Sequence, residues 1–190
     1  MNLKGTKTER NLMSAFAGES QARNRYTYFA GVAKKAGFEQ IAAVFLDTAD
    51  NEKEHAKRFY SLLDDGAVIE IQGSFPKILA DTGANLQEAA AGENMEWATL
   101  YPGFAQEADD EGFAKVADLF RRVAVAERHH EKRYLAFLKN IQEDRVFRRE
   151  EPAVWRCRNC GYLHEGTSAL ELCPACYHPK AHFELLCENW

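Results

Sequence analysis

The sequence has no cysteine among its first 156 residues, no long apolar run and little net charge. Its opening stretch, MNLKGTKTERNLMSAF, contains no apolar segment of signal-peptide length, and nowhere do 18 apolar residues follow one another. These absences predict a cytoplasmic protein with no membrane partner. The net charge is only −5, and buried carboxylates assigned below account for much of it. We therefore expect no nucleic-acid partner.

All five cysteines lie after residue 156. Cys157 with Cys160 and Cys173 with Cys176 form two Cys-x-x-Cys pairs separated by twelve residues. In a reducing compartment such pairs indicate one tetrahedral four-thiolate metal rather than disulfides. The spacing alone favours structural zinc but does not distinguish zinc from iron. We expect Cys187, which stands apart from the pairs, to be a packing residue with no ligand role.

The rest of the chain contains an internal duplication. Residues 34–45 (KKAGFEQIAAVF) and 109–120 (DDEGFAKVADLF) share an apolar pattern at an offset of 75 residues. The dipeptides Gly18–Glu19 and Gly92–Glu93 match at an offset of 74, so the second copy contains one extra residue. This pattern indicates a repeated helix–turn–helix unit.

Apolar residues recur at helical spacing over residues 6–35, 38–64, 82–110 and 113–142. Gly37 and Gly112 follow helical segments and are predicted to end them as C-cap glycines. The segment DGAVIEIQGSFPKI between the copies is too long and too rich in β-branched residues for a tight turn. We therefore predict an all-α four-helix bundle of ferritin-like type, in which one long crossover joins two hairpins.

The extra residue of the second copy lies between Glu93 and Gly112, in the stretch that contains Tyr101, Pro102 and Gly103. A proline inside a helix removes one hydrogen bond, and a one-residue insertion suits a π-bulge. The third helix is therefore predicted to be distorted there.

Two Glu-x-x-His motifs, Glu52–His55 and Glu127–His130, occupy equivalent positions in the two copies. A Glu and a His three residues apart project from the same face of a helix, so each pair is able to chelate one metal. Two such pairs, with a lone glutamate from each of two other helices, make the ligand set of a di-metal carboxylate centre.

The lone glutamates are also present, each in a small or apolar context. The predicted di-metal ligands are Glu19, Glu52, His55, Glu93, Glu96, Glu127 and His130. Five carboxylates converging on one core would be strongly destabilising without cations. Oxygen-rich ligands with two imidazoles suit iron or manganese. The glycines that precede Glu19 and Glu93 suggest crowding at a helix contact.

The two metal positions are predicted to be unequal. Glu96 has no acidic counterpart, because Ala22 stands three residues after Glu19. His55 and Glu96 are therefore expected to compete for the same metal, with the more oxidised ion preferring the carboxylate.

The sequence pattern changes after the bundle. We predict a bundle domain over residues 1–143, a charged linker over 144–152 that ends at Pro152, and a small β ribbon over 153–190. A unit as small as this ribbon rarely folds without a staple such as a metal.

Together these motifs resemble the rubrerythrin family over essentially the full chain. The matching stretches include SAFAGESQARNRY, TADNEKEHAKR, AAAGENMEWATLYPGFA, VAVAERHHEKRYLAF and WRCRNCGYLHEG. The resemblance implies a ferritin-like di-iron domain followed by a rubredoxin-like domain with one iron in the four-cysteine site. It reverses the preference for zinc, because zinc does not carry electrons.

The resemblance also implies a cytoplasmic peroxidase that reduces hydrogen peroxide to water in oxidative-stress defence. Electrons would come from NAD(P)H through a separate reductase or small electron carrier, then through the ribbon iron to the di-iron site. The family's exchange of Glu for His maps onto Glu96 and His55. Tyr26 and Tyr101 match tyrosines near the family's site. Tyr177 stands after Cys176, where free rubredoxins usually have glycine.

Two other functions remain open from the sequence. One is a ferritin-type ferroxidase or iron-handling protein, and the other makes the ribbon a metal-bound module that docks a partner. We expect a homodimer or small homo-oligomer, because electron delivery needs a ribbon close to a di-iron site. Exchange of helices or ribbons between protomers, a domain swap, is one such arrangement.

Overall fold

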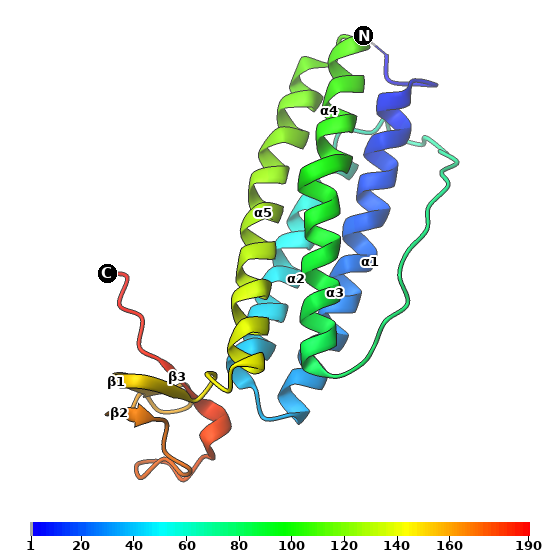
Figure 1. The fold of residues 1–190 in the computed structure, drawn as a ribbon. Helices are drawn as coiled ribbons and strands as arrows, with labels where there is room; N and C mark the ends of the chain where they lie inside the picture. The colour runs from blue at the N-terminus through cyan, green and yellow to red at the C-terminus, as the bar shows by residue number, and fades with distance from the viewer. Residues whose placement is uncertain (1) are drawn as a thin grey trace.

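The computed structural model describes residues 2–190 as a long helical bundle with a small sheet at one end (Figure 1). The bundle contains α1 (Lys7–Lys35), α2 (Glu39–Tyr60), α3 (Thr82–Met95), the π-helix η1 (Glu96–Leu100), α4 (Tyr101–Asp110) and α5 (Ala114–Gln142). Because α3, η1 and α4 are continuous, they form one rod, and the predicted four-helix bundle is confirmed. No helix in the described part of the chain is long and apolar enough to cross a membrane.

Local chemistry explains where the helices begin and end. The Thr6 hydroxyl accepts a hydrogen bond from the Glu9 N–H at 3.1 Å, and the Glu9 carboxylate accepts one from Gly5 at 2.7 Å. Such reciprocal capping satisfies N–H groups that the first turn leaves unpaired. Gly37 and Gly112 have φ angles of +82° and +83°, as expected for the glycines that end α1 and α4.

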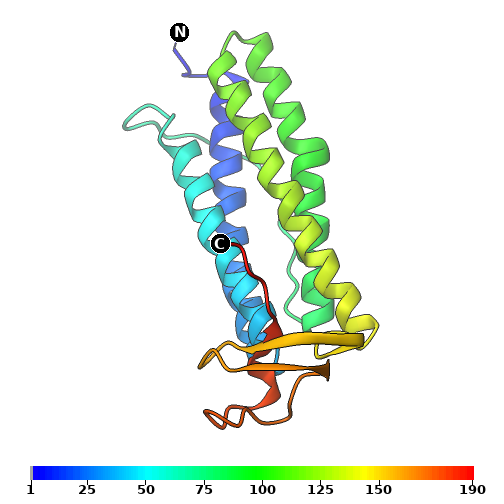
Figure 2. The same cartoon turned by 90° about the vertical axis from the view of Figure 1, so that its left-hand side faces the viewer.

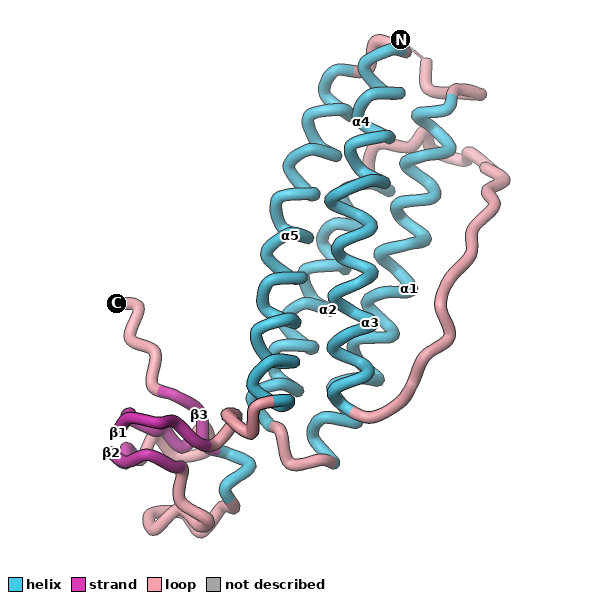
Figure 3. Tube along the Cα trace, in the orientation of Figure 1, coloured by secondary structure: helices cyan, strands magenta, loops and turns pink. Residues whose placement is uncertain are grey.

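The crossover, residues 61–81, is a long loop that runs along the bundle from the end of α2 to the start of α3 (Figure 3). It contains no helix or strand. The connection makes α2 and α3 parallel, while α1 pairs with α2 and α5 with α3 and α4. The predicted single crossover between two hairpins is confirmed.

The predicted distortion of the third helix is the π-helix η1. It begins at Glu96, three residues after Glu93, and ends immediately before Tyr101 and Pro102. The wide turn absorbs the extra residue of the second copy. It changes the direction in which the residues after it point, and this brings Tyr101 into the core, where the side chain is fully buried.

Two apolar clusters fill the bundle on either side of its middle. One contains Tyr26, Phe29 and Phe45, and the other contains Phe59 and Phe120. Burial of such rings supplies most of the bundle's stability, at about 25 cal/mol for each Å² of apolar surface removed from water. The polar residues between the clusters are the predicted metal ligands.

The C-terminal ribbon has a three-stranded antiparallel sheet. Its elements are β1 (Arg148–Cys157), β2 (Leu163–Ser168), the 3₁₀ turn η2 (Lys180–His182) and β3 (Phe183–Leu185), with strand order β2-β1-β3. Trp155 and Phe183 form its small core with two of the cysteines. Strand β1 begins inside the predicted linker: Arg148 pairs with Ser168, and regular pairing resumes at Ala153 after an irregularity in the register. The domain limits given above stand as a proposal.

The ribbon packs against the end of the bundle where α1 turns into α2 (Figure 2). The rings of Phe38 and Phe147 stack with centroids 6.1 Å apart and planes within 11°. Next to them, His182 Nε2 lies 3.9 Å from a Glu39 carboxylate oxygen. The ribbon is therefore fixed far along the bundle axis from its middle.

Candidate metal centres

The middle of the bundle brings six of the seven predicted ligands into two overlapping groups. In each group, one ligand atom per residue lies within 4.8 Å of all the others. The groups are Glu19, Glu52, His55 and Glu127, and Glu52, Glu93, Glu127 and His130. Glu19, Glu52, Glu93 and Glu127 are at most 1% exposed. The sequence repeat therefore becomes a nearly two-fold arrangement of side chains from four helices.

Glu52 and Glu127 belong to both groups, and each places one oxygen near each histidine. The Glu127 oxygens lie 2.9 Å from His55 Nδ1 and 2.7 Å from His130 Nδ1. The corresponding distances for Glu52 are 3.0 and 3.2 Å. This is the geometry of two carboxylates that bridge a pair of metals, with one imidazole directed at each metal.

Asn51 is a contact that the sequence repeat did not reveal. Its side-chain oxygen lies 3.1 Å from His130 Nε2. A proton on Nε2 leaves the lone pair of Nδ1 directed at the cluster, which is how outer contacts orient metal-binding histidines. The equivalent position in the second copy is Ala126, so comparing the two copies gives no indication that Asn51 contacts a histidine ligand.

Two buried tyrosines hold the outer carboxylates across the bundle. Tyr26 on α1 donates a hydrogen bond to Glu93 on α3, and Tyr101 on α4 donates one to Glu19 on α1. Both hydroxyls are in fully buried side chains, where an unmade hydrogen bond would be destabilising by about 1–3 kcal/mol. The tyrosines therefore orient the two carboxylates that are not shared between the groups.

Glu96 is the predicted ligand that belongs to neither group. It is the first residue of η1, and its Oε1 lies 3.9 Å from where a β-carbon on Gly18 would stand. His55, by contrast, points into the cluster. The side chains therefore adopt the arrangement with His55 inward, and the predicted competition between His55 and Glu96 stands as a proposal.

The predicted crowding at Gly18 and Gly92 is wrong. A β-carbon at Gly18 would come no closer than 3.9 Å to a neighbour, and one at Gly92 no closer than 3.8 Å to Arg25. These are ordinary van der Waals distances, so a β-carbon would fit at either position. Both glycines instead line a pocket beside the cluster.

The cluster fits cations better than it fits protons alone. Six buried atoms of its ligands have no hydrogen-bond partner: Glu19 Oε2, Glu52 Oε1, Glu93 Oε2, both oxygens of Glu127 and His130 Nδ1. Burial, and then neighbouring carboxylates, raise the pKa of Glu19 and Glu96 well above the ordinary value, and that of Glu93 to about 8. Metal ions would neutralise this charge and use the unpaired atoms.

The two histidines have pKa shifts that favour their charged forms. Burial alone would lower the pKa of His55, but the carboxylates of Glu127 and Glu52, 2.9 and 3.0 Å from Nδ1, raise it to about 10. The carboxylates of Glu127, Glu52 and Glu93 lie 2.7, 3.2 and 3.5 Å from His130 Nδ1. They likewise outweigh burial at His130 and raise its pKa to about 12. Burial would raise the pKa of Glu52, and the two histidines instead hold it at about 2. Without metal, the histidines thus act as the cations of the cluster.

Metal-free protein is expected to lose stability as the pH rises from about 4.5 to about 10, with Glu93 and His55 both contributing between about 6.5 and about 8. Glu93 and His55 both have raised pKa values in the folded state, about 8 and about 10 against ordinary values of 4.5 and 6.5. Stability from a raised pKa is present below the ordinary value and is lost as the pH rises through the folded value. The depressed pKa of Glu52 matters only below its ordinary value of 4.5. Each extra proton held by the folded state contributes a slope of about 1.4 kcal/mol per pH unit.

Urea unfolding of chelator-treated protein at a series of pH values measures this slope. The matched control is the same protein reloaded with Mn²⁺, in which rising pH is expected to increase stability, because metals compete with protons for the ligands. A metal-free protein whose stability does not fall with pH would contradict the assignment.

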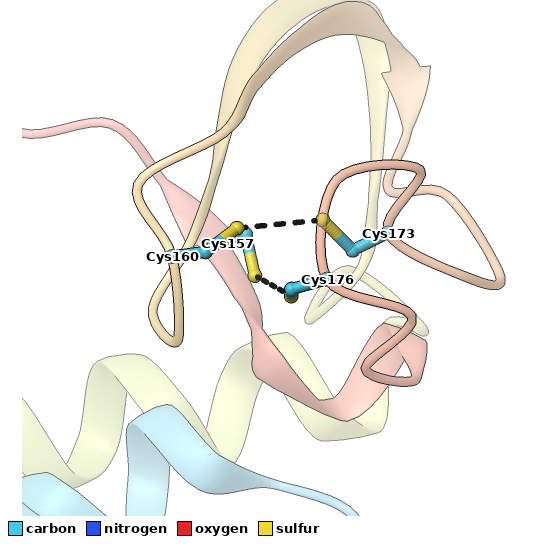
Figure 4. A group of neighbouring side chains, drawn as sticks. All are labelled: Cys157, Cys160, Cys173 and Cys176. Carbon is cyan, nitrogen blue, oxygen red and sulfur yellow. Dashed lines mark hydrogen bonds between the residues drawn. The ribbon is translucent and has the colours of Figure 1, made fainter.

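The second candidate metal centre lies in the ribbon. Cys157, Cys160, Cys173 and Cys176 converge from two loops, with their sulfur atoms facing one another (Figure 4). Cys157 Sγ lies 3.8 Å from Cys176 Sγ, and Cys160 Sγ lies 3.6 Å from Cys173 Sγ. These separations match the edges of a tetrahedron around one metal with sulfur ligands at about 2.3 Å.

The two knuckles have the same backbone geometry despite different residues. Gly161 and Tyr177 follow the second cysteine of each pair, have φ angles of +81° and +58°, and donate hydrogen bonds to Cys157 and Cys173 at 2.8 and 2.9 Å. A non-glycine residue in this conformation is strained by about 1–2 kcal/mol. Tyr177, in place of the usual glycine, therefore leaves the shape of the loop unchanged. Cys187 is exposed, so its predicted packing role is wrong.

Comparisons with known proteins agree with both centres. The family model described as Rubrerythrin matches residues 10–138, and the model described as Rubrerythrin, rubredoxin-like domain, matches residues 155–184. The chain is 60% identical to a rubrerythrin of Nitratidesulfovibrio vulgaris and 56% identical to a rubrerythrin-1 of Clostridium acetobutylicum, covering 100% of this chain and 99% of each relative.

Solved structures agree with the fold. A nigerythrin described as being in a mixed-valence state aligns with a TM-score of 0.64 and 33% identity, covering 97% of this chain and 92% of that one. A Mycobacterium tuberculosis bacterioferritin aligns over 75% of this chain and 90% of its own length, with a TM-score of 0.65 and 18% identity. The second likeness shows the shared bundle fold alone.

Proposed function

The chain belongs to the rubrerythrin family, and on that premise we propose that it is a di-iron peroxidase that reduces hydrogen peroxide to water. The observation that best supports this is the pairing of two centres in one chain: a buried carboxylate–histidine cluster for two metals and a four-thiolate site. The first is suited to reaction with an oxidant and the second to electron transfer.

Iron is the metal that we propose for both centres. Carboxylate oxygens and imidazole nitrogens are ligands that iron accepts, and four thiolates hold an iron that changes oxidation state without rearrangement. Relatives described as nigerythrin include a fully reduced form with all iron ferrous. Two ferrous ions would together supply the two electrons that cleave one O–O bond.

The residues of the bundle centre have distinct proposed roles. Glu52 and Glu127 would be shared by the two metals, His55 and His130 would each bind one metal, and the remaining ligands would be terminal. The terminal ligands are Glu19, Glu93 and, when it replaces His55, Glu96. Tyr26 and Tyr101 keep Glu93 and Glu19 oriented through their hydrogen bonds. The carboxylates of Glu19 and Glu93 are thus preorganised and would keep their positions when Glu96 and His55 exchange.

The position of the ribbon supports a dimer or small homo-oligomer. The ribbon contacts α2 at Glu39, whereas His55 is sixteen residues further along this helix, which is about 24 Å at 1.5 Å per residue. Direct electron transfer over that distance would be slow. We therefore propose that the ribbon of a second copy delivers electrons to each bundle, and that a separate NAD(P)H-dependent reductase or small electron carrier supplies them.

Stopped-flow mixing tests the peroxidase proposal. Anaerobically reduced protein with iron confirmed in both centres is mixed with hydrogen peroxide or with oxygen. We expect the bundle irons to reoxidise at least about tenfold faster with peroxide, since each additional 1.4 kcal/mol of transition-state stabilisation gives that factor. Slow reaction with a preference for oxygen would contradict the proposal. If sizing chromatography then showed a large cage, iron storage of the ferritin type would be the better function.

A further inference from the structure

A pocket of about 560 Å³ lies between α1 and the rod formed by α3, η1 and α4. The crossover covers it from outside through residues 71–76, and Figure 1 shows this loop passing along that side of the bundle. Its walls include both glycines that precede the terminal ligands, Gly18 and Gly92. At these two positions neither helix carries a β-carbon that would narrow the pocket.

The inner end of the pocket reaches the di-metal cluster. Glu96 and Tyr101 line it, and Tyr101 donates to the ligand Glu19. A molecule in the pocket would therefore meet Glu96 before it met the metals. On the opposite side of the bundle His55 closes the cluster, and it does not line this pocket.

Two buried polar atoms in the pocket wall have no partner. Gln21 Oε1 and Arg25 Nε are both buried without a hydrogen bond. The other end of the Arg25 guanidinium pairs with Glu88 at 3.3 Å, and this side chain is only 13% exposed. Buried polar groups normally have partners, so an unpaired acceptor and an unpaired donor here indicate room for a polar ligand group.

Much of the pocket's lining is apolar. Phe75 and Pro76 of the crossover line it, together with Met95, Leu100 and Phe104 of the helical rod. Hydrogen peroxide needs little of this space, because a water molecule occupies about 30 Å³ of liquid and peroxide roughly twice that. Polar groups at the inner end and apolar side chains outside are typical of a site for a small amphipathic molecule.

We propose that this pocket admits organic hydroperoxides, with the –OOH group at the Glu96 end and the organic group beneath the crossover. The inference rests on the proposed function, which supplies the electrons. In the reaction ROOH + 2 e⁻ + 2 H⁺ → ROH + H₂O, the O–O bond breaks, and the two electrons come from the reduced bundle centre. One oxygen leaves as water and the other stays on the organic group as an alcohol.

Stopped-flow mixing of reduced, iron-loaded protein with cumene hydroperoxide and with hydrogen peroxide tests the proposal. We expect both to reoxidise the bundle centre, and we expect cumyl alcohol, the two-electron product, instead of acetophenone. Rapid reaction with hydrogen peroxide but none with cumene hydroperoxide would overturn the pocket proposal alone. Failure of both would overturn the proposed function, and the pocket proposal with it.

A variant in which a larger side chain fills part of the pocket makes the test specific to the pocket. Ala91 lines the pocket from α3 and is exposed, and Ala91→Phe places a ring in the outer part of the space. The ratio of the cumene hydroperoxide rate to the hydrogen peroxide rate is expected to fall at least about tenfold, equivalent to about 1.4 kcal/mol. Ala136→Phe, at an exposed position of α5 outside the pocket, is the matched control and should keep the ratio.

An unchanged ratio in a folded, iron-loaded Ala91→Phe protein would overturn the proposal. Circular dichroism and metal analysis establish folding and loading. Ser14→Phe fills the same pocket from α1 and serves as the second variant if Ala91→Phe does not fold.

Discussion

Glu52→Gln is expected to remove metal from the bundle and to lower the rate of the peroxide reaction by at least about 100-fold. Loss of a residue that only hydrogen-bonds to a metal ligand already lowers metal affinity or activity 10–100-fold, and Glu52 is itself a proposed ligand. Glu52 is 1% exposed and places one oxygen near each of the two histidines. The amide that replaces it has one acceptor and no charge, so it does not bridge two cations. Both metal positions are therefore affected by one substitution.

Glu54→Gln is the matched control for this prediction. It lies two residues further along α2, but its side chain is 62% exposed and paired only with Lys57 at 3.3 Å. We expect wild-type metal content and rate, since an exposed pair contributes little. Metal analysis per chain, with the ribbon iron counted separately from its visible absorbance, measures the outcome. Full bundle occupancy in Glu52→Gln would show that Glu52 is not a bridging ligand.

Cys160→Ser is expected to reduce NAD(P)H-driven turnover to roughly a few per cent while sparing a single turnover. The substitution removes one of four thiolates, and a hard hydroxyl is a poor replacement for a soft sulfur ligand at this site. Electrons from the reductase then have no route to the bundle. A chemical reductant acts on the bundle directly, so the reduced variant should still react with peroxide once.

Cys187→Ser is the control for the ribbon. Cys187 is exposed, as Cys160 is, but it lies outside the four-sulfur cluster. We expect full reductase-driven turnover and an unchanged ferric–thiolate absorbance in this variant. If Cys160→Ser retained full turnover with the reductase, electrons would be bypassing the ribbon, and the proposed path would be wrong.

The duplication explains why so much of the bundle was predictable from the sequence. A single Glu-x-x-His motif is a weak signal, but the pairs Glu52–His55 and Glu127–His130 at equivalent positions constrain each other. The same comparison located the extra residue that becomes η1. Long helices with repeated apolar spacing and glycine ends are also the elements that local sequence describes best.

The features that the sequence did not reveal depend on contacts between distant segments. Asn51 touches His130 but has no counterpart in the second copy. Gly18 and Gly92 were expected at a crowded contact, and only the spacing of α1 and α3 shows that they border a pocket. The distance of the ribbon from His55 likewise depends on how Phe147 packs against Phe38. No local pattern encodes such relations.

The π-helix has a further consequence for how the rod formed by α3, η1 and α4 tolerates a deletion. Pro102 lacks an N–H, so in a regular helix it would leave one carbonyl four residues earlier without a donor. Here the proline is the second residue after η1, where the ladder of hydrogen bonds is already interrupted. Two interruptions of the helix thus lie close together in the chain. A deletion at this location would not simply repair the helix: it would rotate α4 by about 100° relative to α3, carrying Tyr101 away from Glu19.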